Sequence, residues 1–284
     1  MELTERLSQE ALFADVSYAY HEHDLRIRPH LSAWYETPKH MWNPRERIAR
    51  FLGPVTGKRL FDFGCGMGEE AMYLARMGAE VHAMDISSKG VEITKRRAAH
   101  NHLKVEARTG DVLNSGYPDG YFDLIHGIGI LHHVGLEEGL REVQRLLKSG
   151  GRAAFLEHMS NSGLVDWLRA RVQCRQTVSN GLRLIDATGT VTDANFQRGD
   201  GSLTDLMTKG YTDYEKPLTW GQCATTVSKY GAADLYCYSL LYRLRRLAPA
   251  FGTKPIRILD HAILSLLRPL RHYAGLVLIC ITKE

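Results

Sequence analysis

The sequence has few cysteines, and none of them has the spacing of a metal site or of a disulfide-rich domain. The five are Cys65, Cys174, Cys223, Cys237 and Cys280. They are odd in number, widely spaced and include no Cys-x-x-Cys pair, which disfavours both a disulfide scaffold and a structural zinc site. No other metal-ligand spacing stands out, so we expect no metal. Because the cysteines do not form a disulfide pattern, we expect them to be reduced thiols, which is typical of a cytoplasmic protein.

Long apolar runs, a secretory leader and a strong net charge are also lacking. No run reaches the ~18 apolar residues that indicate a membrane-spanning helix. The first residues, Met1-Glu-Leu-Thr-Glu-Arg, have no basic segment followed by an apolar one, so we expect no secretory signal. The 36 Lys and Arg exceed the 32 Asp and Glu by four, which is too few to indicate nucleic-acid binding by itself. The 284 residues predict one large domain, or one domain with additions.

The middle of the chain alternates buried-strand patterns with helix patterns. Strands are expected over residues 59–63, 80–84, 105–108, 121–126 and 152–157. Helices are expected over 69–77, from Ser87 or Ser88 to about Asn101, and over 136–148. This alternation predicts an α/β fold, a doubly wound and mostly parallel sheet with right-handed crossovers.

The flanking segments predict additions to that core. A short helix is expected over residues 3–15, whereas 17–45 have no clean period. Beyond the fifth strand, a helix over 219–229 and strands over 232–239 and 274–282 are expected. We therefore predict an N-terminal cap or lid (1–50), a core (51–158), a substrate-side insertion (159–218), and a completion of the sheet (219–284) that contains a basic helical insertion (240–272).

The clearest motif lies between the first predicted strand and its helix. It reads Asp62-Phe-Gly-Cys-Gly-Met-Gly68. Glycines allow a sharp turn and a close approach of ligand to backbone, and the following helix offers free N–H groups. A dinucleotide fingerprint has the spacing G-x-G-x-x-G, whereas here the third glycine comes one residue early. Asp85 ends the second predicted strand, where a carboxylate can accept both hydroxyls of a ribose.

Three further blocks follow in order: Gly110-Asp-Val112, Phe122-Asp-Leu-Ile-His-Gly127 with Leu131-His-His133, and Arg145-Leu-Leu-Lys-Ser-Gly-Gly151. With these blocks, residues 58–158 resemble the class I S-adenosylmethionine-dependent methyltransferases of the broad small-molecule group. The resemblance implies a seven-stranded Rossmann-like sheet whose last strand runs antiparallel between strands five and six. It also implies S-adenosylmethionine as cofactor and S-adenosylhomocysteine as product.

The resemblance also implies roles for the residues that match these motifs. The glycine turn would line the methionine moiety, Asp85 would hold the ribose, and Gly127 would approach the sulfonium end. The full set of expected cofactor residues is Tyr18, Asp62, Gly64, Cys65, Gly66, Gly68, Asp85, Ile86, Asp111, Val112, Gly127 and His132.

Candidates for chemistry come from strand ends and from the additions, because ligands in such sheets sit at the carboxyl ends of the strands. They are His158, Glu157, His132 and Tyr20. A histidine has a suitable intrinsic pKa to accept a proton. Methyl transfer needs a base only when the acceptor must lose a proton, so each of these residues could equally be structural.

The segment 240–272 alternates leucines with seven Arg and Lys residues. It fits a cover over an apolar substrate, an interfacial membrane helix, an oligomer contact, or an amphipathic helix packed on its own sheet. We expect methylation of an oxygen or carbon atom of a small, apolar metabolite in secondary metabolism, with no nucleic-acid partner, at most peripheral membrane contact, and a possible homo-oligomer.

Several alternatives stay open. Within the same chemistry, the acceptor could be a prenyl or terpenoid double bond, a lipid, a sugar, or a macromolecule such as RNA or protein. Outside it, an NAD-dependent oxidoreductase and a non-catalytic module that binds S-adenosylmethionine remain.

Overall fold

The computed structural model describes residues 3–19, 25–159, 217–241 and 253–284. The predicted insertion 159–218 and the start of the basic segment 240–272 therefore lie largely outside the described residues, as do Tyr20 and Cys174. No described helix is long and apolar enough to cross a bilayer.

Three helices precede the sheet: α1 (Leu3–Ala19), α2 (Pro29–Glu36) and α3 (Pro44–Leu52). The next elements alternate as predicted: β1 (Arg59–Phe63), α4 (Glu69–Arg76), β2 (Glu80–Asp85), α5 (Ser88–His100), β3 (Val105–Thr109), η1 (Val112–Asn114), β4 (Phe122–Ile128), α6 (Leu131–Val134), α7 (Leu136–Leu146) and β5 (Leu147–His158). The chain closes with α10 (Trp220–Val227), β6 (Ala232–Tyr238), α11 (Thr253–Leu266), η4 (Arg268–Tyr273) and β7 (Leu276–Thr282).

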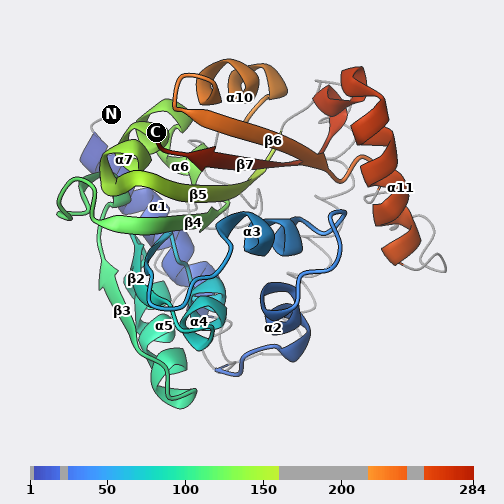
Figure 1. Ribbon diagram of the computed structural model, residues 1–284. Coiled ribbons are helices and arrows are strands. Elements are labelled where there is room, and N and C mark those ends of the chain that lie inside the picture. The colour runs from blue at the N-terminus through green and yellow to red at the C-terminus, as the bar shows by residue number, and fades with distance from the viewer. Residues whose placement is uncertain (1–2, 20–24, 160–216, 242–252) are drawn as a thin grey trace, which may run out of the picture.

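The seven strands form one sheet in the order β3-β2-β1-β4-β5-β7-β6 (Figure 1). All described pairings are parallel except those of β7, which runs antiparallel between β5 and β6. This confirms the predicted fold class and the place of the last strand.

Two apolar cores cover the two faces of the sheet. Successive strand residues point to opposite faces, so Phe61 and Phe63 of β1 join one core and Leu60 joins the other. The Phe61 core is closed by apolar side chains of α7 and α10, and the Leu60 core by those of α2 to α5. Helices on both faces leave the carboxyl ends of β1 to β4 free to build a site.

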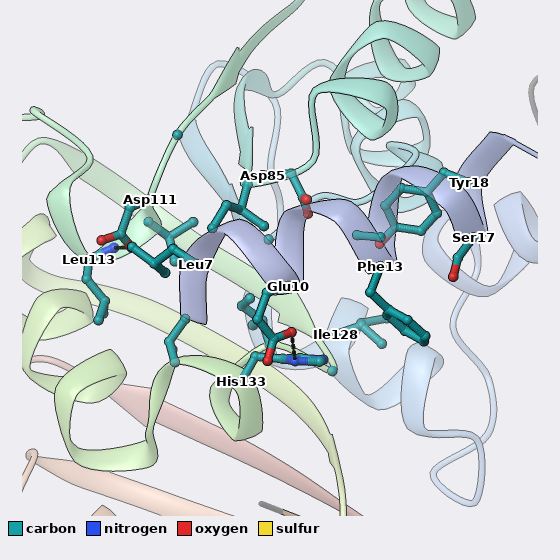
Figure 2. Close-up of a pocket in the computed structure, with 18 of the residues that line it drawn as sticks. Leu7, Glu10, Phe13, Ser17, Tyr18, Asp85, Asp111, Leu113, Ile128 and His133 are labelled. Carbon is teal, nitrogen blue, oxygen red and sulfur yellow. Dashed lines mark hydrogen bonds and ion pairs between the residues drawn. The ribbon is translucent and has the colours of Figure 1, made fainter. Parts of the chain in front are cut away.

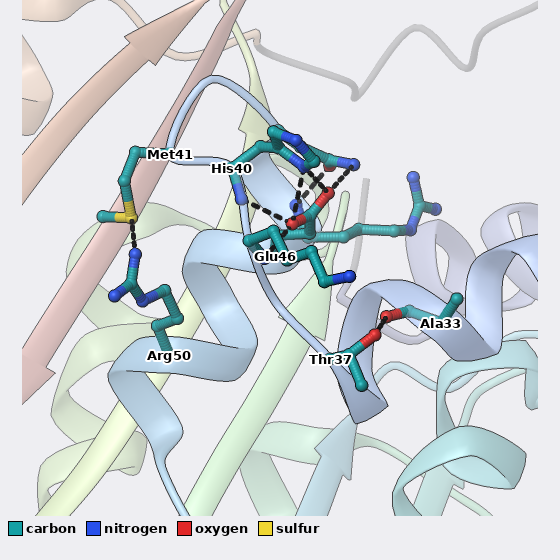
Figure 3. A network of polar contacts seen from close by, with 9 residues as sticks. Ala33, Thr37, His40, Met41, Glu46 and Arg50 are labelled. Carbon is teal, nitrogen blue, oxygen red and sulfur yellow. Dashed lines mark hydrogen bonds and ion pairs between the residues drawn. The ribbon is translucent and has the colours of Figure 1, made fainter.

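A buried carboxylate organises the turn between α2 and α3 (Figure 3). Glu46 is almost fully buried and accepts hydrogen bonds from the backbone N–H groups of Lys39 and His40 and from the Asn43 amide. Met41, in the same turn, accepts a hydrogen bond from the Tyr238 hydroxyl through its backbone oxygen at 3.3 Å. The segment without a clean period is therefore held by polar contacts within the turn and by one contact with β6, which is distant in sequence.

Candidate functional site

The glycine motif forms a tight turn after β1. Gly64 and Gly66 have φ values of +78° and +51°, a region that favours glycine. A Cβ atom on Gly64 would lie 2.6 Å from the Cγ1 atom of Ile130, and one on Gly66 would lie 3.0 Å from the Tyr18 hydroxyl oxygen. The turn therefore lies directly under side chains from the β4–α6 loop and from α1, and only glycines fit there.

Asp85 ends β2 beside this turn, and backbone groups hold its carboxylate. Its Oδ2 atom accepts from the N–H of Gly66 at 2.7 Å, and its Oδ1 atom accepts from the N–H of Ser87 at 2.9 Å. Burial raises the pKa of this carboxyl, while the two hydrogen bonds oppose the rise. The carboxylate is thus fixed in direction with lone pairs to spare for a ligand.

Asp62 lies deeper, on the strand itself. Its Oδ1 atom is 3.5 Å from Nδ1 of His126, while Oδ2 is buried and makes no hydrogen bond to any described residue. Burial raises the pKa of Asp62, and His126 opposes the rise. An unpartnered buried carboxylate oxygen is costly, so this position is suited to an additional hydrogen-bond donor.

A cavity of about 270 Å³ opens where β1, β2, β3 and β4 end (Figure 2). This is slightly below the ~300–1,000 Å³ of typical small-molecule sites. From the sheet side it is lined by Gly64, Asp85, Ile86, Gly110, Asp111, Val112, Leu113, Asn114, Ile128, Gly129, Ile130, His133 and Val134. Polar groups at the strand ends and apolar side chains around them suit a ligand with a polar end and a flat apolar part.

Helix α1 crosses the open side of this cavity (Figure 2). It contributes Leu7, Glu10, Phe13, Ala14, Ser17 and Tyr18 to the lining. Tyr18 is partly buried, and its pKa is raised first by desolvation and then by the negative charge of Asp85. The Tyr18 hydroxyl therefore stays protonated beside the glycine turn.

Two carboxylates fasten α1 on opposite sides of the cavity. Asp15 accepts hydrogen bonds from the Ser87 hydroxyl and, at 2.9 Å, from the N–H of Lys89 at the start of α5. Glu10 lies 3.0 Å from Nδ1 of His133 on α6 (Figure 2). The helix is thus a cover tied to the loops that follow β2 and β4.

Glu157 and His132 form a buried pair at the end of β5. Glu157 is fully buried, and its Oε2 atom is 2.7 Å from Nδ1 of His132. Its Oε1 atom accepts from the N–H groups of Ile130 and Leu131, each at 2.9 Å. Both carboxylate oxygens are therefore occupied by Ile130 of the β4–α6 loop and by the start of α6, and Ile130 itself lines the cavity.

The structure brings about half of the expected cofactor residues to the cavity. Tyr18, Gly64, Asp85, Ile86, Asp111 and Val112 line it directly. Asp62, Cys65, Gly66, Gly68, Gly127 and His132 are not part of the lining. Gly127 packs against the Phe155 ring, and the next residues, Ile128 and Gly129, border the cavity instead.

Three of the four expected catalytic residues lie together at the end of β5, outside the lining of the cavity. His158 is exposed, and its ring centroid lies 6.0 Å from that of His132, so Glu157, His132 and His158 are neighbours. Tyr20 lies outside the described residues. Sequence analysis missed five residues of α1 that line the cavity, which are Leu7, Glu10, Phe13, Ala14 and Ser17. Their spacing of three to four residues along one helical face is the pattern that could have identified them.

No cluster of His, Cys, Asp or Glu side chains in the described part of the chain could hold a metal ion. Cys65 is buried in the turn, and burial raises the pKa of its thiol well above the usual range. That thiol is therefore protonated and unsuited to act as a nucleophile.

The comparisons with known proteins agree with this geometry. A methyltransferase domain family matches residues 61–155, from β1 through most of β5. A demethylmenaquinone methyltransferase of Clavibacter sepedonicus is 33% identical over 148 residues, which are 52% of this chain and 56% of that protein. A fatty-acid O-methyltransferase of Mycolicibacterium smegmatis is 33% identical over 119 residues, which are 41% of this chain and 43% of that protein. The chain thus spans about half the length of these curated relatives.

Among solved structures, the geranyl diphosphate C-methyltransferase of Streptomyces coelicolor A3(2) superposes with a TM-score of 0.53. The match covers 84% of this chain and 78% of that chain at 16% sequence identity. At this identity the similarity concerns the fold alone.

Proposed function

Residues 61–155 form a class I S-adenosylmethionine-dependent methyltransferase domain, and from this premise we propose that the chain transfers a methyl group from S-adenosylmethionine to an oxygen or carbon atom of a small, apolar acceptor. The observation that carries the proposal is the covered cavity at the ends of β1 to β4, where Asp85, Asp111 and the glycine turn meet.

The residues of this cavity fit S-adenosylmethionine. The positive φ values of Gly64 and Gly66 make a cradle that any Cβ atom would fill. The fixed carboxylate of Asp85 is suited to the ribose hydroxyls, and Ile86, Val112 and Leu113 offer an apolar surface to the adenine. The unpartnered oxygen of Asp62 can receive a donor from the methionine end, directly or through water.

When bound, the cofactor supplies a methyl group that is already activated by a positively charged sulfur. The work left to this chain is alignment of the two reactants and exclusion of water. Helix α1 serves both purposes, because Phe13 and Tyr18 close the cavity from above. The aromatic face of Tyr18 can also stabilise a cation that lies near the glycine turn.

A proton must be removed only if the acceptor is a hydroxyl group. We propose that His158 or His132 accepts that proton, with His158 favoured because it is exposed at the strand end. Since both oxygens of Glu157 are already bonded, its proposed role is to orient His132 and the β4–α6 loop. A carbon acceptor would need no such base.

The two curated relatives support the apolar character of the acceptor. Their names describe methylation of demethylmenaquinone and of fatty acids, which are small molecules with large apolar parts. The apolar lining contributed by α1 is compatible with such a molecule. A cytoplasmic location, a role in secondary metabolism and homo-oligomer formation remain expectations drawn from the sequence.

Calorimetry with S-adenosylmethionine, S-adenosylhomocysteine and NAD tests the cofactor class first. We expect both methionine-derived ligands to bind and NAD not to bind. Mass spectrometry of quinols, phenols and fatty acids incubated with the enzyme and cofactor then tests for a gain of one methyl group. Binding of NAD alone would overturn the proposal, and cofactor binding without turnover on any acceptor would favour a non-catalytic module.

A further inference from the structure

Helix α11 and the following turn η4 carry an unusual concentration of exposed apolar side chains. The described residues include six large hydrophobics that are strongly exposed, and five of them lie on this segment. They are Ile258, Leu259, Leu266, Leu267 and Tyr273, which we call the α11 patch. Leu266 is 79% exposed. Such a concentration marks an interaction surface more often than an ordinary solvent face.

The opposite face of α11 is already used for packing. Leu264 is buried in the core, and the His261 ring stacks on Tyr238 of β6 with centroids 6.4 Å apart. Asp260 is buried and accepts a hydrogen bond from the N–H of Leu241. The exposed apolar face is therefore a second face of a helix that is held in place. Figure 1 shows α11 at the outer end of the sheet.

The exposed charges of the segment that carries the patch have one sign. Residues 253–273 contain Lys254, Arg257, Arg268 and Arg271, and their one acidic residue is the buried Asp260. Lys254 and Arg268 are exposed and belong to none of the ion pairs between described residues. An apolar face on a segment that carries cations and no exposed acidic residue matches a surface that is apolar inside and anionic outside.

We propose that the α11 patch docks this chain on a bilayer that contains anionic lipids, with the apolar side chains entering the interface and Lys254 and Arg268 contacting the headgroups. A second copy of the chain is disfavoured, because a two-fold contact through this patch would bring the same cations together. Nucleic acid is disfavoured because exposed leucines offer nothing to a phosphate backbone. The docking does not depend on the proposed transfer reaction.

The test is sedimentation of the full chain with vesicles of phosphatidylcholine alone and of phosphatidylcholine mixed with phosphatidylglycerol. We expect binding to the anionic vesicles, weaker binding as salt is raised, and little binding to the neutral ones. The double variant Leu259→Ser/Leu266→Ser should bind at least about tenfold more weakly. Lys254→Gln and Arg268→Gln should each reduce binding by about fivefold.

Two controls match these variants. Lys95→Gln removes an exposed cation of α5, and Leu12→Ser replaces an exposed leucine of α1, so both should bind anionic vesicles like the unaltered chain. Circular dichroism and unfolding in urea would show that every variant is folded. Equal binding to both vesicle types, no binding to either, or variants that bind unchanged would overturn the proposal. A dimer in size-exclusion chromatography that the leucine variants dissociate would also overturn it, in favour of a second copy.

Discussion

At the scale of single residues, the site depends on carboxylates whose oxygens are held by backbone N–H groups. Asp85 and Glu157 each accept two such bonds, although they lie on different strands and in different parts of the site. Backbone donors fix a carboxylate in place without adding a positive side chain. The negative charge of each carboxylate is therefore not neutralised, and it remains available to a ligand at Asp85 and to the β4–α6 loop at Glu157.

Replacement of Asp85 by Asn tests its proposed contact with the ribose. Loss of a charged acceptor costs about 1.5–3 kcal/mol, so we expect S-adenosylmethionine to bind about 10- to 100-fold more weakly in calorimetry. Burial raises the pKa of Asp85, so its carboxylate takes up a proton at a higher pH than an ordinary Asp does. As the pH is lowered, the cofactor affinity of the unaltered chain should therefore begin to fall while the pH is still above the ordinary titration range of Asp. That fall should be absent in Asp85→Asn. An unchanged affinity would remove Asp85 from the cofactor site.

Replacement of Glu157 by Gln separates a positioning role from a catalytic one. The amide keeps one acceptor oxygen but loses the charge, so we expect a loss of about 1–3 kcal/mol in the free energy of unfolding, measured with urea. If His158 is the base, turnover should fall without a change in the pH profile, because the carboxylate of Glu157 contacts His132 and not His158. The control is Glu138→Gln, at an exposed position on α7, which should change neither the free energy of unfolding nor the turnover. A shifted pH profile in Glu157→Gln would identify His132, the partner of Glu157, as the base in place of His158.

At the scale of elements, α1 is the part of the site most open to experiment. Its contact with α5 rests on Asp15, which accepts from the Ser87 hydroxyl and the Lys89 N–H. The variant Asp15→Ala should release bound cofactor about tenfold faster in stopped-flow measurements, because one anchor of the cover is lost. Leu12→Ala, on the exposed side of the same helix, should release it at the original rate. Equal rates in the two variants would show that α1 does not control release.

The elements also show which features could be predicted from sequence. The position of the turn after β1, the end of β2 at Asp85 and the start of α5 at Ser87 or Ser88 were predicted correctly, because each depends on residues close together in the chain. Helices α2 and α3 were missed, since they are short and the Glu46 network that joins them has no periodic pattern.

Two boundaries were predicted wrongly for local reasons. Helix α7 ends at Leu146 rather than Lys148, and β5 begins at Leu147 rather than Arg152. The glycines at 150 and 151 suggested a helix end followed by a turn, but the backbone there continues as strand. The pairing of Glu157 with His132 could not be predicted, because only the parallel register of β4 and β5 brings the two side chains together.

At the scale of the whole molecule, the central strands are tied together at the edge opposite the cofactor site. Asp123, near the start of β4, accepts a hydrogen bond from the N–H of Arg59 in β1 at 2.9 Å and one from Nζ of Lys148 in β5 at 2.7 Å. Three adjacent strands are thus joined through one carboxylate. This role does not involve a ligand and concerns the stability of the sheet.

The hydrogen bonds at Asp123 should make the free energy of unfolding depend on pH in the acid range. Partial burial acts to raise the pKa of Asp123, but the hydrogen bonds from Lys148 and Arg59 outweigh it and lower the pKa below its usual range. A carboxyl with a depressed pKa in the folded state contributes stability that is full above the pKa of the unfolded chain and is lost as the pH falls through the folded value. The carboxyl is partly exposed, so solvent screening limits this contribution to about 1 kcal/mol.

Unfolding in urea across the acid range measures this contribution directly. Near neutral pH, Asp123→Asn should be about 1 kcal/mol less stable than the unaltered chain, and the difference should close as the pH falls below the ordinary range of Asp. Asp119→Asn alters an exposed partner of Arg145, so its free energy of unfolding should differ much less from that of the unaltered chain at any pH. A gap between Asp123→Asn and the unaltered chain that persisted in acid would mean that the side-chain shape of Asp123, rather than its charge, joins β1, β4 and β5.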